Sequence, residues 1–204
     1  MKITRYAVGM LGTNCYLVTD EKTGCSFVVD PGDHMILNKL ENTKNIKYIL
    51  LTHAHFDHVM GTKALKGETG ANVAIYTGEA EAMNDPMLNM SGFFGMDSIP
   101  GFAADVLLHD GGTLECGELK IKVIHTPGHS RGGVCYIVED VIFSGDTLFL
   151  EGVGRTDGPG GNFSSLRQSI GKLFGMDGDY TVYPGHGEPT TLEHERKYNP
   201  LAAD

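Results

Sequence analysis

Short apolar runs bounded by glycine, proline or charged residues recur along this 204-residue chain and predict a protein of mixed strands and helices. The clearest run, 46–51, reads Ile-Lys-Tyr-Ile-Leu-Leu and is typical of a buried strand. The run 119–124 alternates apolar and polar side chains, as a strand with one buried face does. Helices are expected at about 35–40, 61–65 and 163–174, and further strands at about 14–18, 26–30, 73–76, 141–143 and 180–183.

The chain shows no internal repeat, low-complexity tract or linker that would divide it. A chain of 204 residues can bury one substantial core and leaves little room for a second sizeable domain. We therefore expect a single domain over residues 1–204.

Candidate chemistry appears directly after the run 46–51. Four metal-competent side chains fall within six positions there: His53, His55, Asp57 and His58. Neutral imidazoles and carboxylates suit zinc, iron or manganese. His53 and His55 can point together, whereas Asp57 and His58 begin a helix and point elsewhere. Two groups of ligands so close together predict two neighbouring metals rather than one.

Three more metal-competent residues follow strand-like segments further along the chain. His129 lies in a Thr-Pro-Gly-His-Ser segment, Asp146 in a Ser-Gly-Asp-Thr segment and His186 in a Pro-Gly-His-Gly segment. Each stands beside glycine or proline after a short apolar run, which is typical of loops at one edge of a sheet. The repetition indicates a common site for all seven residues.

In this order the residues resemble the HxHxDH signature, followed by a single His, Asp and His, of the metallo-β-lactamase superfamily of metallo-hydrolases. The resemblance covers almost the whole chain, from the Val-Val-Asp-Pro-Gly segment at 28–32 to the Pro-Gly-His segment at 184–186. It implies an α/β (α+β) fold, a four-layer αββα sandwich in which two sheets face each other and helices cover the outside.

The resemblance also assigns the ligands, position by position. His53, His55 and His129 would hold the first metal, Asp57, His58 and His186 the second, and Asp146 would bridge the two. Two divalent ions are implied, with zinc expected and iron or manganese as alternatives. Such a pair activates a shared water for attack on an acyl carbonyl. Asp57 would have a catalytic role as well, by orienting that nucleophile through a hydrogen bond.

The segment 152–157, Gly-Val-Gly-Arg-Thr-Asp, resembles the GxGRxD stretch of glyoxalase II-like thioesterases. It implies a small-molecule thioester substrate such as S-lactoylglutathione, with Arg155 binding a substrate carboxylate. The alternative is that Arg155 pairs with Asp157 and only fixes the loop. The chain ends soon after His186, where the larger glyoxalase II enzymes carry a helical region, and it has Asp157 where they have tyrosine. The single-domain glyoxalase II-like hydrolases are therefore the closer match.

The main rival activity is that of a persulfide dioxygenase with one iron on the same fold. That family shares the GxGRTD stretch and uses the positions of His53, His129 and Asp146 as its ligands. A lactonase or β-lactamase is a further hydrolytic alternative. A non-catalytic metal-binding homologue is disfavoured because all seven ligand positions are filled.

Charge and composition restrict the partners. The net charge of −10 disfavours an extended basic surface for DNA or RNA. No segment has the length and apolar character of a signal peptide core or a membrane span, so we expect no membrane partner and a cytoplasmic location. The four cysteines show no CxxC spacing and are expected to be buried, reduced thiols: Cys15, Cys25, Cys116 and Cys135.

Two features stay outside the ligand signature. Four histidines match no ligand position and are expected to be structural or at the surface: His34, His109, His125 and His194. His34 is the least certain of them. The segment 83–96 is rich in Met and Phe. A role in the core or at a homodimer interface is favoured there over a pocket wall or lid.

Overall fold

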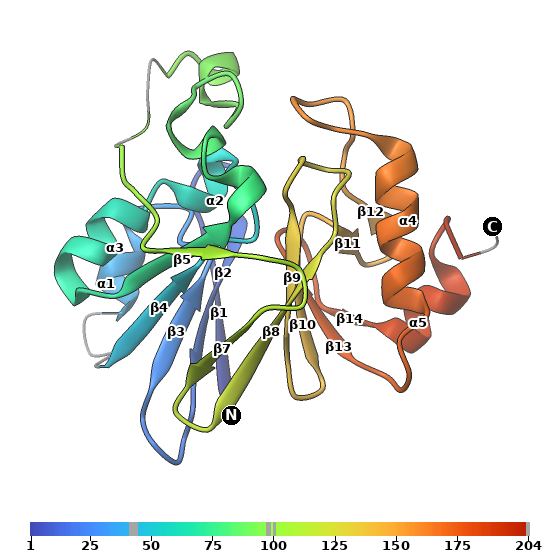
Figure 1. Ribbon diagram of the computed structural model, residues 1–204, viewed down its shortest axis with the longest axis horizontal. Helices are drawn as coiled ribbons and strands as arrows, with labels where there is room; N and C mark the ends of the chain where they lie inside the picture. The colour runs from blue at the N-terminus through green and yellow to red at the C-terminus, as the bar shows by residue number, and fades with distance from the viewer. Residues whose placement is uncertain (41–44, 97–98, 100, 203–204) are drawn as a thin grey trace.

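The apolar runs form two facing β-sheets in the computed structural model, which describes residues 1–40, 45–96, 99 and 101–202 (Figure 1). In the first sheet, neighbouring strands follow one another along the chain. Its first three strands are antiparallel and the later pairs are parallel. The strands are β1 (Lys2–Val8), β2 (Thr13–Thr19), β3 (Ser26–Val29), β4 (Ile46–Leu50), β5 (Asn72–Tyr76) and β6 (Val106–Leu108).

The second sheet is formed by the second half of the chain, in the order β14-β13-β10-β9-β8-β7. Its members are β7 (Thr113–Cys116), β8 (Leu119–His125), β9 (Val134–Val138), β10 (Val141–Gly145), β13 (Thr181–Pro184) and β14 (Thr190–Thr191). Only the β10–β13 pair is parallel. Beside it lies a small ribbon of β11 (Leu148–Phe149) and β12 (Gly152–Val153).

Helices cover the outer face of each sheet (Figure 1). On the first sheet lie α1 (Ile36–Leu40) and α3 (Thr62–Thr69), and on the second lie α4 (Phe163–Phe174) and α5 (Leu192–Tyr198). A short helix, α2 (Phe56–Val59), and three 3₁₀ turns, η1 (Thr77–Glu79), η2 (Ala82–Asn84) and η3 (Ser91–Phe94), complete the described elements. None of the helices within the described ranges is long and apolar enough to cross a membrane.

Three apolar layers hold the sheets and helices together. Between the sheets, Phe27, Tyr136 and Phe143 are fully buried. Ile36 and Leu65 lie between the first sheet and its helices, and a third layer under α4 contains Leu166, Ile170 and Leu173. Three apolar layers separate four structural layers, so the predicted αββα sandwich is confirmed.

The cysteine prediction was wrong for one pair. Cys25, just before β3, and Cys116, at the end of β7, form a disulfide that joins the two sheets across 91 positions of sequence, with Cα atoms 5.7 Å apart. The sequence carries no local sign of this pairing because the two strands meet only when the sheets pack. Cys15 and Cys135 are free and buried, as expected. Burial raises the pKa of both thiols, that of Cys135 to about 11, so they stay protonated near neutral pH.

Candidate metal centre

The first sheet supplies four of the predicted ligands at the end of β4. His53 and His55 lie in the loop that leaves this strand, and Asp57 and His58 lie on α2. The loop is fixed by Asp30, which directly follows β3 and has a positive φ of 50°. The Asp30 carboxylate accepts hydrogen bonds from the Thr52 N–H at 2.8 Å and from Thr52 Oγ1 at 2.6 Å.

The second sheet supplies the other three. His129 lies in the β8–β9 connection, Asp146 directly follows β10, and His186 follows β13. The His186 loop is held against β2, since the Tyr16 hydroxyl donates to the Pro184 carbonyl at 2.6 Å. Glycine is required at 185 because a Cβ there would collide with Asp146 Oδ1 and His58 Cε1. The loop can therefore approach the other ligands closely.

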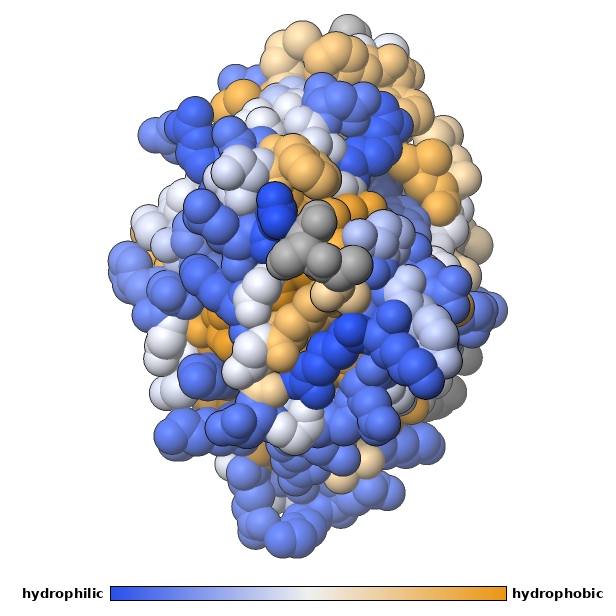
Figure 2. Space-filling view, turned by 90° about the vertical axis from the view of Figure 1, so that its right-hand side faces the viewer, coloured by the Kyte–Doolittle hydropathy of each residue, from blue (hydrophilic) through white to orange (hydrophobic). Residues whose placement is uncertain are grey.

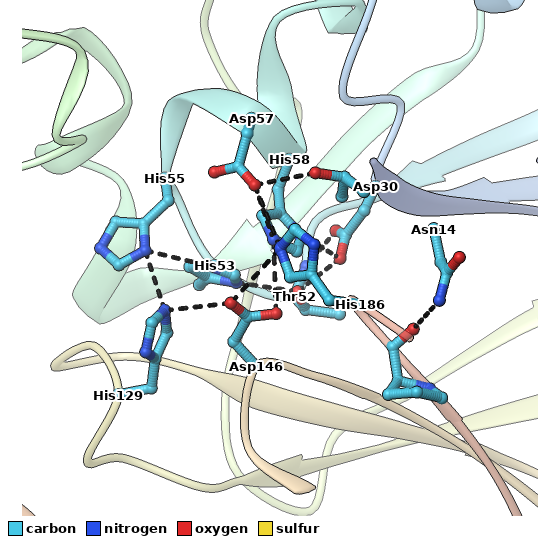
Figure 3. Close-up of polar contacts among 12 residues, drawn as sticks. Asn14, Asp30, Thr52, His53, His55, Asp57, His58, His129, Asp146 and His186 are labelled. Atoms are coloured by element: carbon cyan, nitrogen blue, oxygen red, sulfur yellow. Dashed lines mark hydrogen bonds and ion pairs between the residues drawn. The ribbon is translucent and has the colours of Figure 1, made fainter. Parts of the chain in front are cut away.

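One group of ring nitrogens converges around His55. Its Nδ1 lies 3.1 Å from His53 Nε2 and 2.9 Å from His129 Nε2 (Figure 3). Asp146 Oδ2 is 3.5 Å from the same His129 nitrogen. The three histidines form a group of potential metal ligands drawn from both sheets.

A second group gathers around Asp57. Its Oδ2 lies 3.2 Å from His186 Nε2 and 3.5 Å from His58 Nε2. The two oxygens of Asp146 face this group as well, with Oδ1 3.4 Å from His58 Nε2 and Oδ2 3.7 Å from His186 Nε2. Asp146 thus lies between the two groups (Figure 3).

The donors fit divalent metal ions. His58 Nε2 and Asp146 Oδ1 are buried, and neither has a hydrogen-bond partner among the residues that the structure describes. Buried polar atoms of this kind are costly unless something binds them. Atoms that ligate one tetrahedral ion at about 2.1 Å lie about 3.4 Å apart. The spacings around Asp57, 3.2 and 3.5 Å, match this value, and those around His55, 2.9 and 3.1 Å, are shorter. Imidazole and carboxylate donors suit zinc, iron and manganese alike.

Neighbouring side chains and backbone groups orient the ligands. His58 Nδ1 is 2.9 Å from Asp30 Oδ2, and His53 Nδ1 is 3.0 Å from Thr52 Oγ1. The Thr13 hydroxyl donates to Asp57 Oδ2 at 2.8 Å. His129 Nδ1 lies 2.8 Å from the backbone carbonyl oxygen of Arg155. Such contacts fix the ring orientation of metal ligands and tune their basicity.

In the metal-free protein, the histidines of the site differ in their pKa values. Burial and neighbouring histidines lower the pKa of His53, and they lower that of His55 to about 3. Burial has the same tendency at His58, but Asp57, Asp146 and Asp30 outweigh it and raise the pKa to about 10. The pKa of His186 is also raised, because a hydrogen bond to Asp57 and the charge of Asp146 outweigh its burial. His53 and His55 are therefore neutral at pH 7, whereas His58 is protonated in the metal-free protein.

Five of the seven candidate ligands line a pocket of about 370 Å³: His55, Asp57, His129, Asp146 and His186. The Arg155 side chain, 79% exposed, lines it and makes two hydrogen bonds to Asp157, at 2.9 and 2.8 Å. The ion pair between Arg155 and Asp157 that was considered from the sequence is therefore formed, and substrate binding by Arg155 stays a prediction.

The segment 83–96 contributes to two places, because Met83 is buried in the core while Met90 and Phe94 line the pocket.

Four residues at the centre were not predicted from the sequence: Thr13, Asp30, Thr52 and Glu79. Asp30 and Thr52 lie within the segments that carried the resemblance, but nothing local revealed their contacts. Glu79 is buried and accepts hydrogen bonds from the Ala54 and Gly132 N–H groups at 3.0 and 2.7 Å. Within the described ranges, His34, His109, His125 and His194 belong to no cluster of three potential ligands.

Comparison with known proteins agrees with this geometry. A family model for the metallo-beta-lactamase superfamily matches residues 8–186. Probable metallo-hydrolase YqgX of Bacillus subtilis is 36% identical over 209 residues, covering 98% of this chain and 97% of the relative. Hydroxyacylglutathione hydrolase GloC of Haemophilus influenzae is 31% identical over 208 residues, covering 98% of each.

Solved structures show the same fold. The B3 metallo-beta-lactamase BLEG-1 superposes with a TM-score of 0.92 at 35% identity, over 100% of both chains. TTHA1623, in a di-iron-bound form, gives a TM-score of 0.83 at 32% identity, over 97% of this chain and 99% of the other. ETHE1 from Myxococcus xanthus gives a TM-score of 0.84 at 27% identity, over 100% of this chain and 86% of the other. The ligand order, the αββα sandwich and these matches together show that the chain belongs to the metallo-beta-lactamase superfamily.

Proposed function

We propose that this protein is a dinuclear, metal-dependent hydrolase that cleaves thioesters of a small thiol such as S-lactoylglutathione. Support for hydrolysis comes from the relatives named as metallo-hydrolase and hydroxyacylglutathione hydrolase, which this chain matches over nearly its whole length. Support for two ions comes from Asp146, whose two oxygens face His58 and His129 from between the two ligand groups.

The described pocket lining offers no group that could protonate a leaving group, and this observation supports the thioester assignment most directly. Apart from the seven candidate ligands, the described lining offers one carboxyl group, Asp157. The hydrogen bond from Arg155 lowers the pKa of that carboxyl, so it is ionised at neutral pH and cannot act as a general acid. A thiolate, whose conjugate acid has a pKa near 8.5, leaves without such help far more readily than an alkoxide.

The chain's own groups orient the reaction. Divalent ions at such a centre lower the pKa of bound water and polarise a substrate carbonyl. Asp57 Oδ2 faces both His58 and His186 and is held by Thr13, so its carboxylate can accept a proton or a hydrogen bond from the attacking water. Asp146 faces both halves of the site, with Oδ1 3.4 Å from His58 Nε2 and Oδ2 3.5 Å from His129 Nε2.

Metal counting with activity in the same sample tests the proposal. The protein is purified without added metal, zinc, iron and manganese are quantified per chain, and S-lactoylglutathione hydrolysis is measured. We expect close to two ions per chain, thioester cleavage abolished by Asp146→Ala, and no effect of Asp177→Ala, a change at an exposed carboxylate.

Two further assays compare the alternatives. Oxygen uptake with glutathione persulfide measures the dioxygenase reaction. Cleavage of a chromogenic cephalosporin measures β-lactamase activity, an alternative that we keep because of the similarity to BLEG-1. One iron per chain with persulfide-dependent oxygen uptake, or cephalosporin cleavage faster than thioester cleavage, would overturn the proposal.

A further inference from the structure

We propose that, among thioesters, the pocket favours those that carry an apolar hydrocarbon group next to the scissile bond. This inference rests on the proposed thioester hydrolysis and names its substrate class. The pocket volume of about 370 Å³ lies within the range of small-molecule sites. Its polar lining consists mainly of the candidate ligands, so the apolar side chains in the rest of the lining decide which substrate group is favoured.

Three separate parts of the chain place apolar side chains in those walls. Leu11 comes from the turn between β1 and β2, Met90 and Phe94 from the segment 83–96, and Phe149 and Val153 from the β11–β12 ribbon. The Phe94 ring packs on Phe56, with centroids 4.7 Å apart. Convergence of distant segments on one cavity indicates a built site rather than a chance patch.

Several of these side chains are exposed although they are large and apolar. Leu11 is 43% and Phe94 is 47% exposed. Apolar surface gathered at one place on a soluble protein indicates a binding site. Figure 2, which views the α4 and α5 side, shows a mainly hydrophilic face with hydrophobic surface at its upper end and near its middle; the segment 83–96 lies at the upper end in Figure 1.

Two substrate series test the preference. One varies the acyl group (acetyl, butyryl, hexanoyl) on a fixed thiol, and the other varies the alkyl length of the thiol on a fixed acetyl group. We expect kcat/KM to rise about fourfold per methylene in one series, the factor that corresponds to about 0.8 kcal/mol of buried CH₂. The series that responds identifies the part of the substrate in the pocket.

Matched variants of one segment complete the test. Phe94→Ala should flatten the rise, whereas Met87→Ala, at a side chain that is 55% exposed and outside the pocket lining, should leave it unchanged. A flat or falling kcat/KM in both series, with thioesters still cleaved, would overturn the apolar preference alone. If no thioester is cleaved at all, the proposed function fails and this inference with it.

A second, independent observation concerns Glu79. We infer that Glu79 is a positioning residue that holds the two loops of the first ligand group together. Its side chain is 3% exposed and comes from η1, an element that contributes no ligand. Oε2 accepts from the Ala54 N–H at 3.0 Å and Oε1 from the Gly132 N–H at 2.7 Å.

These two N–H groups belong to the two loops that carry the first ligand group, one with His53 and His55 and the other with His129. Ala54 lies between His53 and His55 on the first sheet, and Gly132 follows His129 on the second. A Cβ at Gly132 would lie 2.8 Å from Glu79 Cγ and 2.9 Å from its backbone nitrogen, so this close packing requires glycine. The glutamate therefore couples the backbones that set the 2.9 Å approach of His55 to His129.

Glu79→Gln tests this role, because the amide keeps the size but replaces one acceptor by an NH₂ group that would face an N–H donor. The matched control is Glu195→Gln. Glu195 is also buried and accepts hydrogen bonds from the Glu151 N–H and from Asn199, but it belongs to α5 and ties that helix to the loop at 151.

Metal affinity is measured by chelator competition with cobalt(II), and the stability of the metal-free protein by denaturant unfolding. We expect both variants to lose stability, and Glu79→Gln alone to weaken metal binding by about 10–100-fold, the usual effect of losing a group that supports metal ligands. Equal affinity losses in both variants, or none in Glu79→Gln, would show that Glu79 is merely structural.

Discussion

At the scale of single residues, the two ligand groups differ in the protons that they hold. His53 and His55 have lowered pKa values, so they offer free lone pairs at neutral pH. The pKa values of His58 and His186 are raised, that of His58 to about 10, so a metal must displace a proton from His58 at neutral pH. The centre therefore combines two histidines that are ready to bind a cation, His53 and His55, with His58, at which metal binding depends on pH.

This difference predicts proton release on metal binding. His58, with a pKa of about 10 in the metal-free protein, is protonated at pH 7, so filling its group releases protons and affinity rises with pH up to about 10. Calorimetric titration with zinc at pH 7, in two buffers of different ionisation enthalpy, measures the protons released. A heat of binding that is the same in both buffers would contradict the prediction.

A second prediction concerns Thr13, whose hydroxyl donates to Asp57. Thr13→Val keeps the shape but removes this donor, so we expect a loss of about 10-fold or more in metal affinity at the Asp57 group or in activity. The control is Thr19→Val in the same strand, which removes a hydroxyl contact to Ser26 instead. Equal effects of the two changes would assign the loss to the strand rather than to the ligand.

The sequence was sufficient to name the seven residues that gather at the centre, because they share a fixed spacing and follow strand ends. It did not reveal the residues that support them. Asp30 meets His58 across 28 positions, Thr13 meets Asp57 across 44, and Glu79 meets Gly132 across 53. Contacts over such separations depend on how the sheets pack, and single residue types carry no local trace of them.

At the scale of elements, prediction worked where a segment was long and amphipathic. The helix expected at 163–174 is α4, Phe163–Phe174, with Leu166, Ile170 and Leu173 buried on one face. The two-residue strands β11, β12 and β14 were missed because two residues show no periodicity. The edge strand β1 was missed as well, although its exposed and less exposed positions alternate in part.

The start of α4 gives a prediction at this scale. Asn162 caps the helix by accepting a hydrogen bond from the Ser165 N–H at 2.9 Å. Asn162→Ala should lower the free energy of unfolding by about 1 kcal/mol, whereas Asn162→Ser, which can also cap, should lower it less. Urea unfolding of the three proteins measures this, and equal stability of the alanine and serine variants would contradict the role of the cap.

At the scale of the whole molecule, the disulfide between Cys25 and Cys116 joins the two sheets. A cross-link between distant positions restricts the unfolded chain, with a typical contribution of about 2–4 kcal/mol. We expect a reducing agent to lower the free energy of unfolding by that amount in the natural protein and to have no effect on a Cys25→Ser/Cys116→Ser variant. Equal stability with and without the reducing agent would show that the bond contributes nothing.

The partition of the site between the two halves of the chain has a further consequence. The connection at 109–112 is the point where the chain passes from the first sheet to the second, with His53, His55, Asp57 and His58 before it and His129, Asp146 and His186 after it. Each half alone holds an incomplete set of donors. The Cys25–Cys116 disulfide also spans this connection, so a protein severed there would separate into two fragments only once that bond is reduced or removed, and metal occupancy would then report their reassociation.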